Sequence, residues 1–158
     1  MPAVSEPAGA PVLPLRLRPL GVRIAAFAFG LVLLGTVVLV WLTLPAAAQD
    51  GFTILQRITV VGMVLGVLAI GHALGRCRVD ADEDGLTLVN GYRSHRLAWQ
   101  QVVSVSLRPG SPWAVLDLAD GTTRSALGIQ GSDGARAVRQ TRQLRALVEA
   151  RAASDPRG

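Results

Sequence analysis

Two long runs of uncharged, apolar residues dominate the N-terminal half of the chain. They cover residues 24–44 and 58–74, and a short, more polar segment separates them. At a helical rise of about 1.5 Å per residue the runs reach about 31 Å and about 26 Å, close to the thickness of the hydrocarbon layer of a bilayer. The pattern predicts a transmembrane helical hairpin with a short extracytoplasmic loop.

From residue 76 onward the pattern changes to short stretches in which apolar and polar residues alternate. Val103, Val105 and Leu107, for example, alternate with Ser104 and Ser106. Such a period of two is typical of strands that bury one face. The predicted strands are 77–81, 86–89, 92–98, 102–107, 113–118 and 122–127.

Turn and helix signals complete this region. The pairs 84–85, 90–91 and 120–121 are Asp-Gly, Asn-Gly and Asp-Gly, which favour hairpin turns with positive φ at both central positions. A helix is predicted from Ser132 or Asp133 to about Ala150. Its apolar stripe consists of Ala137, Thr141, Leu144 and Val148. One amphipathic helix must bury such a stripe against the sheet, so the fold class is α+β.

These patterns divide the chain into four parts. Residues 1–21 form a leader rich in proline and arginine, which we expect to be disordered. Residues 22–75 hold the two spans, residues 76–152 form one small domain, and residues 153–158 are a disordered tail.

The arginines indicate the orientation of the hairpin. Five lie next to the outer ends of the two runs: Arg16, Arg18, Arg23, Arg76 and Arg78. Only Arg57 lies near the connecting loop. Because positive residues stay on the cytoplasmic side, the chain is expected to be a multi-pass plasma-membrane protein with both termini in the cytoplasm.

An alternative treats the first run as a cleaved signal peptide. Residues 46–48 are alanines, which resemble a small-residue cleavage site ending at Ala48. The apolar run and the leader before it are both longer than a typical signal, so the hairpin is favoured. Cleavage after Ala48 remains open.

Glycines at four-residue spacing predict how the spans pack. Gly62 and Gly66 form one such pair in the second span, Gly71 and Gly75 form another, and Ala26 and Gly30 offer a small pair in the first span. Small residues let helix backbones approach closely in lipid. The short loop favours packing between the two spans of one chain over packing in a homo-oligomer, which remains an alternative.

The composition argues against several kinds of site and partner. All 16 basic residues are arginine, and Cys77 is the single cysteine, which excludes an intrachain disulfide and cannot make a zinc site alone. Trp99 and Trp113 look like strand residues and not like platforms for stacking bases, so no nucleic-acid partner is expected.

No reaction centre is recognisable. His95 is the only histidine after the second run, and it has no nucleophile elbow or phosphate-binding glycine motif beside it. Asp117 and Asp120 could form a carboxylate pair, but a strand position and a turn position explain them. We therefore expect neither an enzyme nor a cofactor.

The acidic segment 80–85 partly matches a calcium-binding loop. Asp80, Asp82, Asp84 and Gly85 match the first half of an EF-hand calcium loop. The position of the bidentate glutamate is occupied by Gly91, however, and the flanking residues are predicted strands. A solvated hairpin turn without metal is the favoured interpretation.

Several short motifs carry a family resemblance. They are Leu97 and Trp99 before Val102, the segments 112–114 and 116–121, Ile129-Gln130 and Asp133-Gly134. Together with the two spans and the terminal helix, they resemble the actinobacterial membrane proteins described as pleckstrin-homology (PH) domain proteins, or low molecular weight protein antigens. The resemblance implies a partly open barrel of two antiparallel sheets with the helix at one end, and it brings no established activity.

PH domains that bind inositol phosphates typically use basic residues in the first hairpin loop. The segment 80–85 would be that loop here, and its negative charge opposes headgroup binding. The favoured function is therefore a PH-like module that binds a protein partner or acts as a scaffold at the inner membrane surface.

The alternative function is a structural domain that lies against anionic lipids. Its contact would be a slanting ridge on the terminal helix, formed by Arg136, Arg139, Arg142 and Arg145. Each arginine lies about 60° around the helix from the one before it.

Overall fold

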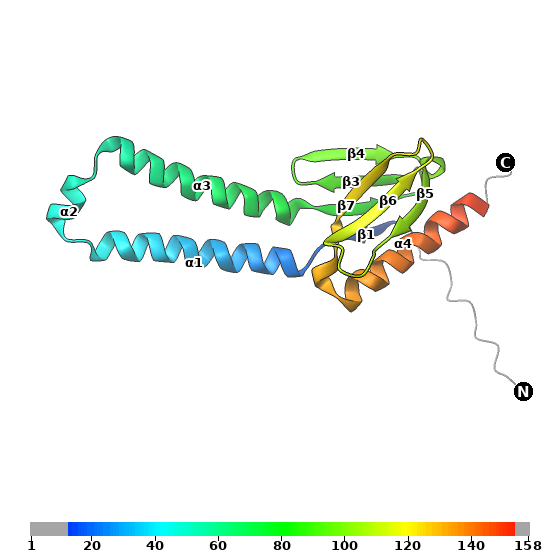
Figure 1. The fold of residues 1–158 in the computed structure, drawn as a ribbon, viewed down its shortest axis with the longest axis horizontal. Helices are drawn as coiled ribbons and strands as arrows, with labels where there is room; N and C mark the ends of the chain where they lie inside the picture. The colour runs from blue at the N-terminus through cyan, green and yellow to red at the C-terminus, as the bar shows by residue number, and fades with distance from the viewer. Residues whose placement is uncertain (1–12, 154–158) are drawn as a thin grey trace, which may run out of the picture. The chain divides into compact units, whose positions relative to one another are not determined.

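The computed structural model describes residues 13–153, and these form two compact units. One unit, Leu20–Arg76, is helical. The other combines the chain before Leu20 with the chain after Arg76. Figure 1 shows the elements of both units.

The helical unit contains two long helices, α1 (Gly21–Thr43) and α3 (Ile54–Arg76). Each has 23 residues and is long and apolar enough to cross a membrane. The prediction of two apolar helices is confirmed, although both extend past the predicted runs and include Arg23 and Arg57. The predicted loop contains a short helix, α2 (Ala46–Gly51).

Side chains fasten the end of the helical unit at which α2 lies. Gln49 donates from Nε2 to the carbonyl oxygens of Trp41 and Leu44, at 3.0 Å each. The Arg57 guanidinium donates to Gln49 O at 2.8 Å and lies over the Trp41 ring, whose centroid is 5.4 Å away. Phe52 packs edge-on against Trp41. This connection is therefore an ordered cap.

Only some of the predicted small residues lie in close contact between α1 and α3. A Cβ on Gly30 would lie 3.1 Å from the Leu68 side chain, and one on Gly71 would lie 3.6 Å from Ala26 Cβ. A Cβ on Gly62 or Gly66 would meet nothing within 4 Å. Gly62 and Gly66 therefore make no close contact with α1 in this structure, and their role in helix packing stays a prediction.

The second unit is built from two antiparallel sheets and a terminal helix, α4 (Ala135–Ala153). The first sheet has the order β1-β2-β3-β4, and the second has the order β5-β6-β7. Their bounds are β1 Leu15–Leu17, β2 Arg78–Ala81, β3 Leu86–Asn90, β4 Arg93–Leu97, β5 Val102–Ser106, β6 Trp113–Leu118 and β7 Thr123–Gln130. This arrangement confirms the predicted α+β fold.

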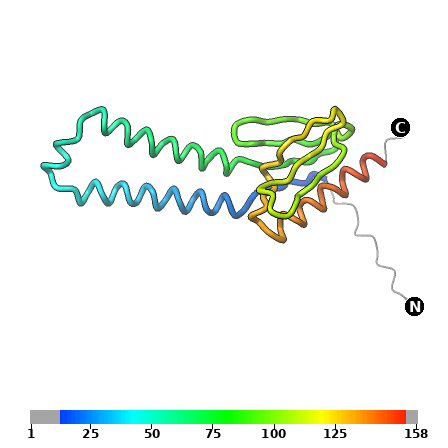
Figure 2. The backbone as a smooth tube through the Cα atoms, in the orientation of Figure 1, coloured from blue at the N-terminus to red at the C-terminus, as the bar shows by residue number. Residues whose placement is uncertain are grey.

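Strand β1 is the main departure from the sequence analysis. Residues 15–17, predicted to be part of a disordered leader, pair with β2 in the register Leu15↔Ala81 to Leu17↔Val79. The prediction is wrong for these three residues because Leu17 is buried in the core. Figure 2 shows the chain passing from β1 into the helices and returning into β2. Residues 1–12 and 154–158 lie outside the described part of the chain.

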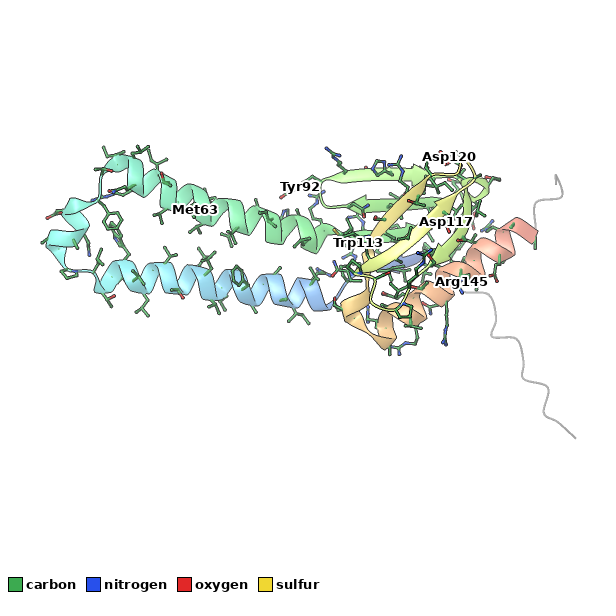
Figure 3. All side chains as sticks on the ribbon, viewed as in Figure 1. Met63, Tyr92, Trp113, Asp117, Asp120 and Arg145 are labelled. Atoms are coloured by element: carbon green, nitrogen blue, oxygen red, sulfur yellow. The ribbon has the colours of Figure 1, made fainter. Side chains whose placement is uncertain are left out.

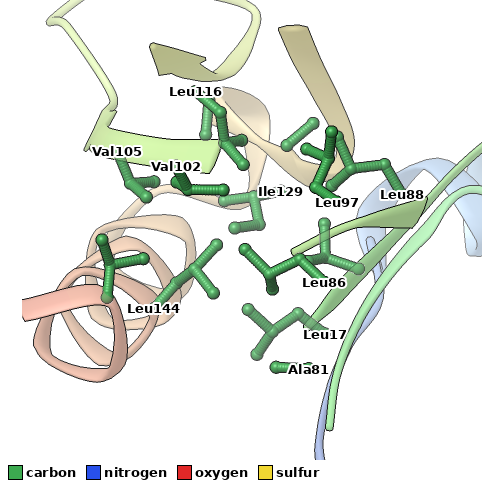
Figure 4. Close-up of a cluster of buried hydrophobic side chains, with 14 of the residues drawn as sticks. Leu17, Ala81, Leu86, Leu88, Leu97, Val102, Val105, Leu116, Ile129 and Leu144 are labelled. Carbon is green, nitrogen blue, oxygen red and sulfur yellow. The ribbon is translucent and has the colours of Figure 1, made fainter. Parts of the chain in front are cut away.

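The core lies between the sheets and α4, and Figure 4 shows many of its side chains. Leu86 and Leu88 contribute from the first sheet, Leu116 and Ile129 from the second, and Leu144 from α4; each is 0% exposed. The predicted helix stripe faces this core, because its four residues are all buried. The apolar residues that recur every two positions in the strands and about every 3.6 positions in the helix thus pack into one cluster.

Gly128 allows the two sheets to approach closely. A Cβ at this position of β7 would lie 2.6 Å from the backbone of Arg78 in β2. Asn90 ties the same region, because its side chain donates to Ser125 O at 2.7 Å and accepts from Leu127 N at 3.2 Å. Backbone contact, and not only side-chain packing, holds β7 against β2 and β3.

The turns use fewer positive-φ residues than predicted. Gly85, Gly91 and Gly121 have φ of 156°, 65° and 79°, whereas no described non-glycine residue has positive φ. Asp84, Asn90 and Asp120 therefore do not form the first half of the expected turns. The terminal helix also begins later than predicted, since Ser132 and Asp133 lie in a 3-10 turn, η2 (Gly131–Asp133).

Candidate functional site

Three arginines pair with the aspartates of the acidic segment 80–85. Asp80 lies 2.8 Å from Arg16 Nε and 2.7 Å from Arg78 Nε. Arg96 Nη2 lies 3.3 Å from Asp84 and 3.9 Å from Asp82. Each carboxylate of the EF-hand-like pattern thus faces a guanidinium, and within residues 13–153 no group of three or more His, Cys, Asp or Glu residues could hold a metal.

The hairpin is also ordered from within. Asp82 Oδ1 accepts from the backbone N–H of Asp84 at 3.0 Å and of Gly85 at 2.9 Å. The indole of Trp99 donates to Asp82 O and Glu83 O, and Arg151 of α4 lies over its ring. The acidic segment is therefore a rigid turn tied to the terminal helix, and it joins the second and third strands instead of the first and second.

The connection between the first and second strands is the helical unit itself. Arg18, Pro19 and Leu20 link β1 to α1, and Cys77 alone links α3 to β2. Cys77 is buried, and its Sγ accepts from Gly91 N at 3.2 Å. The tip of the β3–β4 hairpin therefore lies against the residue that follows α3, and exposed Tyr92 lies at this tip (Figure 3).

The arginine ridge of α4 is divided in two. Arg136, Arg139, Arg142 and Arg145 are all exposed, but Arg145 donates from Nε and Nη2 to Val105 O, at 3.1 and 2.8 Å. Arg145 thus fastens α4 to β5 (Figure 3). The other three make no hydrogen bond or ion pair with the described residues, so they form the solvent-facing part of the ridge.

The titratable groups considered for catalysis lie apart. His95 is half-buried in β4, and Asp117 in β6 accepts a short hydrogen bond from the Ser104 hydroxyl. Asp120 lies in the exposed β6–β7 turn, where the Thr122 hydroxyl, and then the Thr122 N–H, donate to it and lower the pKa of its carboxyl. Figure 3 shows Asp120 beyond the end of β6, and its position in the turn accounts for its hydrogen bonds to Thr122.

Comparison with known proteins agrees with this architecture. Residues 76–147 match the family model described as a bacterial PH domain. Proteins from Mycobacterium bovis and from two strains of Mycobacterium tuberculosis, all described as uncharacterized, are each 34% identical over 88 residues. No solved structure matches the chain.

The chain thus carries a bacterial PH-like domain next to two helices that are apolar enough to span a membrane. The predicted resemblance is confirmed at this level. The aligned region is 56% of this chain, and the chain spans about half the length of the curated relatives it matches. The family match begins at residue 76, so β1 lies outside it.

Sequence reasoning missed several residues that hold the second unit together. A signal for β1 was present, because Leu13, Leu15 and Leu17 alternate with Pro14 and Arg16. The proline content and the three-residue length of β1 obscured it. The Arg145–Val105 and Cys77–Gly91 contacts join residues 40 and 14 positions apart, and no local pattern indicates them.

Proposed function

We propose that this protein is an integral membrane protein that presents its PH-like domain as a protein-interaction or scaffolding module at the cytoplasmic face of the plasma membrane. The pairing of β1 with β2 carries this proposal. These strands flank the two apolar helices and share one ladder, so the outer ends of α1 and α3 must lie on the same side of any membrane that the helices cross.

The arginines support the cytoplasmic side. Arg16, Arg18, Arg76 and Arg78 flank the helices at the ends that carry the domain, and Arg57 lies near the opposite cap. The positive-inside rule then favours a cytoplasmic domain. With linkers of three residues and one residue, at about 3.3–3.6 Å each, the domain stays at the membrane surface.

Reporter fusions test the topology. A reporter active only in the cytoplasm should work when it is fused after Gly158, and it should fail when it is inserted in the segment 45–53 that contains α2. Activity of the reporter in that segment would refute the hairpin.

Photo-crosslinking tests the interaction function. A photo-crosslinking residue on the domain, used in native membranes, should yield a defined stoichiometric partner. Neighbours captured in proportion to their abundance would argue against an interaction module.

A second candidate function is a lipid-apposed structural domain, and the three solvent-facing arginines favour it. Arg136, Arg139 and Arg142 could each gain about 1 kcal/mol beside an anionic leaflet. A spin label at Val138→Cys, next to this ridge and 43% exposed, should lose access to an aqueous relaxation agent in anionic but not in zwitterionic nanodiscs. Glutamine at the three arginine positions or added salt should restore access; equal access in both lipids would remove this candidate.

A further inference from the structure

The two sheets have four edge strands, β1 and β4 in the first and β5 and β7 in the second. An edge strand carries unpaired N–H and C=O groups that can pair with a strand from another chain. Which of the four edges is open decides where an added strand could bind.

Both edges of the second sheet are partly occupied. The carbonyl of Val105 in β5 accepts two hydrogen bonds from Arg145 of α4. In β7, Ser125 O and Leu127 N bond to the side chain of Asn90, and Gly128 lies directly against the backbone of β2. Each of these two edges is thus contacted by another element of the domain.

Strand β1 is a poor template for a different reason. It has only three residues, and prolines lie on both sides of it, at Pro14 and Pro19. Proline has no N–H to donate and is one of the devices by which natural sheets protect their edges. An added strand would find too few consecutive donors and acceptors there.

Strand β4 is the open edge. It has five residues, contains no proline, and pairs with β3 on one side only within the described chain (Figure 1). Gly91, with φ of 65°, begins a two-residue hairpin loop in which Asn90 pairs with Arg93. In such a hairpin the closing pair is hydrogen-bonded and the pattern alternates, so Ser94 and Arg96 direct their N–H and C=O groups away from β3.

The charge of this edge indicates the occupant. Arg93, Ser94 and Arg96 are exposed, and β4 contains no acidic residue. The Arg96 side chain is 64% exposed even with its Asp84 partner. A second copy of β4 would add two more arginines to the same seam, which opposes self-association, whereas carboxylates on both faces of an added strand would meet Arg93 on one face and Arg96 on the other.

We propose that β4 binds an extended acidic segment of a partner protein, which adds to the first sheet as a fifth strand through the backbone of Ser94 and Arg96. This proposal rests on the proposed interaction function and names its surface. The Cys77–Gly91 bond ties the turn before β4 to the residue that precedes β2.

A capped heptapeptide Thr-Glu-Glu-Thr-Glu-Glu-Thr, which as a strand carries glutamates on both faces, is a suitable probe, used with the full-length protein in zwitterionic nanodiscs. NMR should show shifts and slower hydrogen exchange at the Ser94 and Arg96 amides. Ser94→Pro, which removes one outward donor, should weaken binding about tenfold, whereas Ser94→Ala, which keeps the N–H, should bind like the wild type. Arg93→Glu should also weaken binding, and Arg124→Glu, at an exposed position of β7, should not.

Several results would overturn the inference. They are unchanged binding by both Ser94→Pro and Arg93→Glu, shifts confined to α4, no peptide binding, or equal binding of the matching lysine peptide. If Ser94→Pro does not fold, Arg93→Glu with its Arg124→Glu control decides alone. Concentration-dependent shifts at β4 without peptide would name a second copy as the occupant. A stoichiometric partner that crosslinks in native membranes independently of Ser94 would leave the proposed function intact and remove only the β4 site.

Discussion

At the scale of single residues, short side-chain contacts decide the electrostatics of exposed turns. Asp120 is fully exposed, yet the Thr122 hydroxyl and backbone N–H hold the pKa of its carboxyl below the ordinary value of 3.8. Hydrogen bonds to the charged form cause this shift, with a smaller contribution from the charge of Arg124.

The variant Thr122→Val tests that cause. Loss of the hydroxyl should raise the pKa of Asp120 towards 3.8, and NMR titration of the side-chain carboxyl measures it. A lowered folded pKa stabilises the fold above the unfolded pKa, and this contribution disappears as pH falls through the folded value. The variant should therefore lose less stability than the wild type as the pH is lowered through this range. An unchanged Asp120 pKa would show that the backbone N–H alone suffices.

Gly128 decides how close the two sheets can lie. Replacing it with alanine would bring a methyl group to 2.6 Å from the backbone of Arg78, where no flexible side chain can move aside. Gly128→Ala should therefore destabilise the domain by about 1–3 kcal/mol, as overpacking does. Chemical denaturation measures the loss. Thr123→Ala, at an exposed position of the same strand, is the control and should have little effect; equal midpoints for the two variants would contradict the close approach.

At the scale of elements, β1 should contribute to stability far beyond its length. Leu17 is 4% exposed and belongs to the cluster that holds Leu86 and Leu144. Leu17→Ala should cost about 2–5 kcal/mol, the range for truncating a buried leucine. Arg16→Ala, which removes an exposed ion-pair partner of Asp80, should cost less than about 1 kcal/mol. If denaturation of the full-length protein gave similar losses for both variants, β1 would not be part of the core.

The helix pair offers an equally direct test. Cysteines at Ala26 and Gly71 should form a disulfide on oxidation, because a Cβ at Gly71 would lie 3.6 Å from Ala26 Cβ. Gly30→Leu should lower the yield, since even a Cβ there meets Leu68 at 3.1 Å. Gly62→Leu places the same side chain in open space and should leave the yield unchanged. A loss of crosslinking in the Gly62 variant would return that glycine to the helix interface.

At the scale of the whole molecule, the pairing of β1 with β2 makes cleavage of the first helix as a signal peptide unfavourable. Cleavage after Ala48 would release β1 together with α1, leaving β2 without its partner and the core without Leu17. Tags placed before Met1 and after Gly158 should therefore occur on one membrane-extracted chain in an immunoblot. A mature species that carries only the C-terminal tag would support the signal-peptide alternative.

The sequence by itself determined the class of each element. Uninterrupted apolar runs can only be helices if they face lipid, strand alternation requires one buried face, and the spacing of Ala137, Thr141, Leu144 and Val148 matches a helix. Five of the seven strands and the terminal helix lie within a few residues of their predicted bounds, and β7 extends three residues further. These are local properties, and local spacing is enough to show them.

Only the tertiary structure decided how distant segments combine. It paired β1, which precedes the helices in the chain, with β2; it brought Gly30 and Gly71, among the predicted small residues, into close contact between α1 and α3; and it bonded Arg145 of the ridge to Val105. It also left β4 as the open edge of the first sheet. Each outcome depends on which backbones meet after the chain has folded, and a sequence pattern records the face of an element but not the partner that covers it.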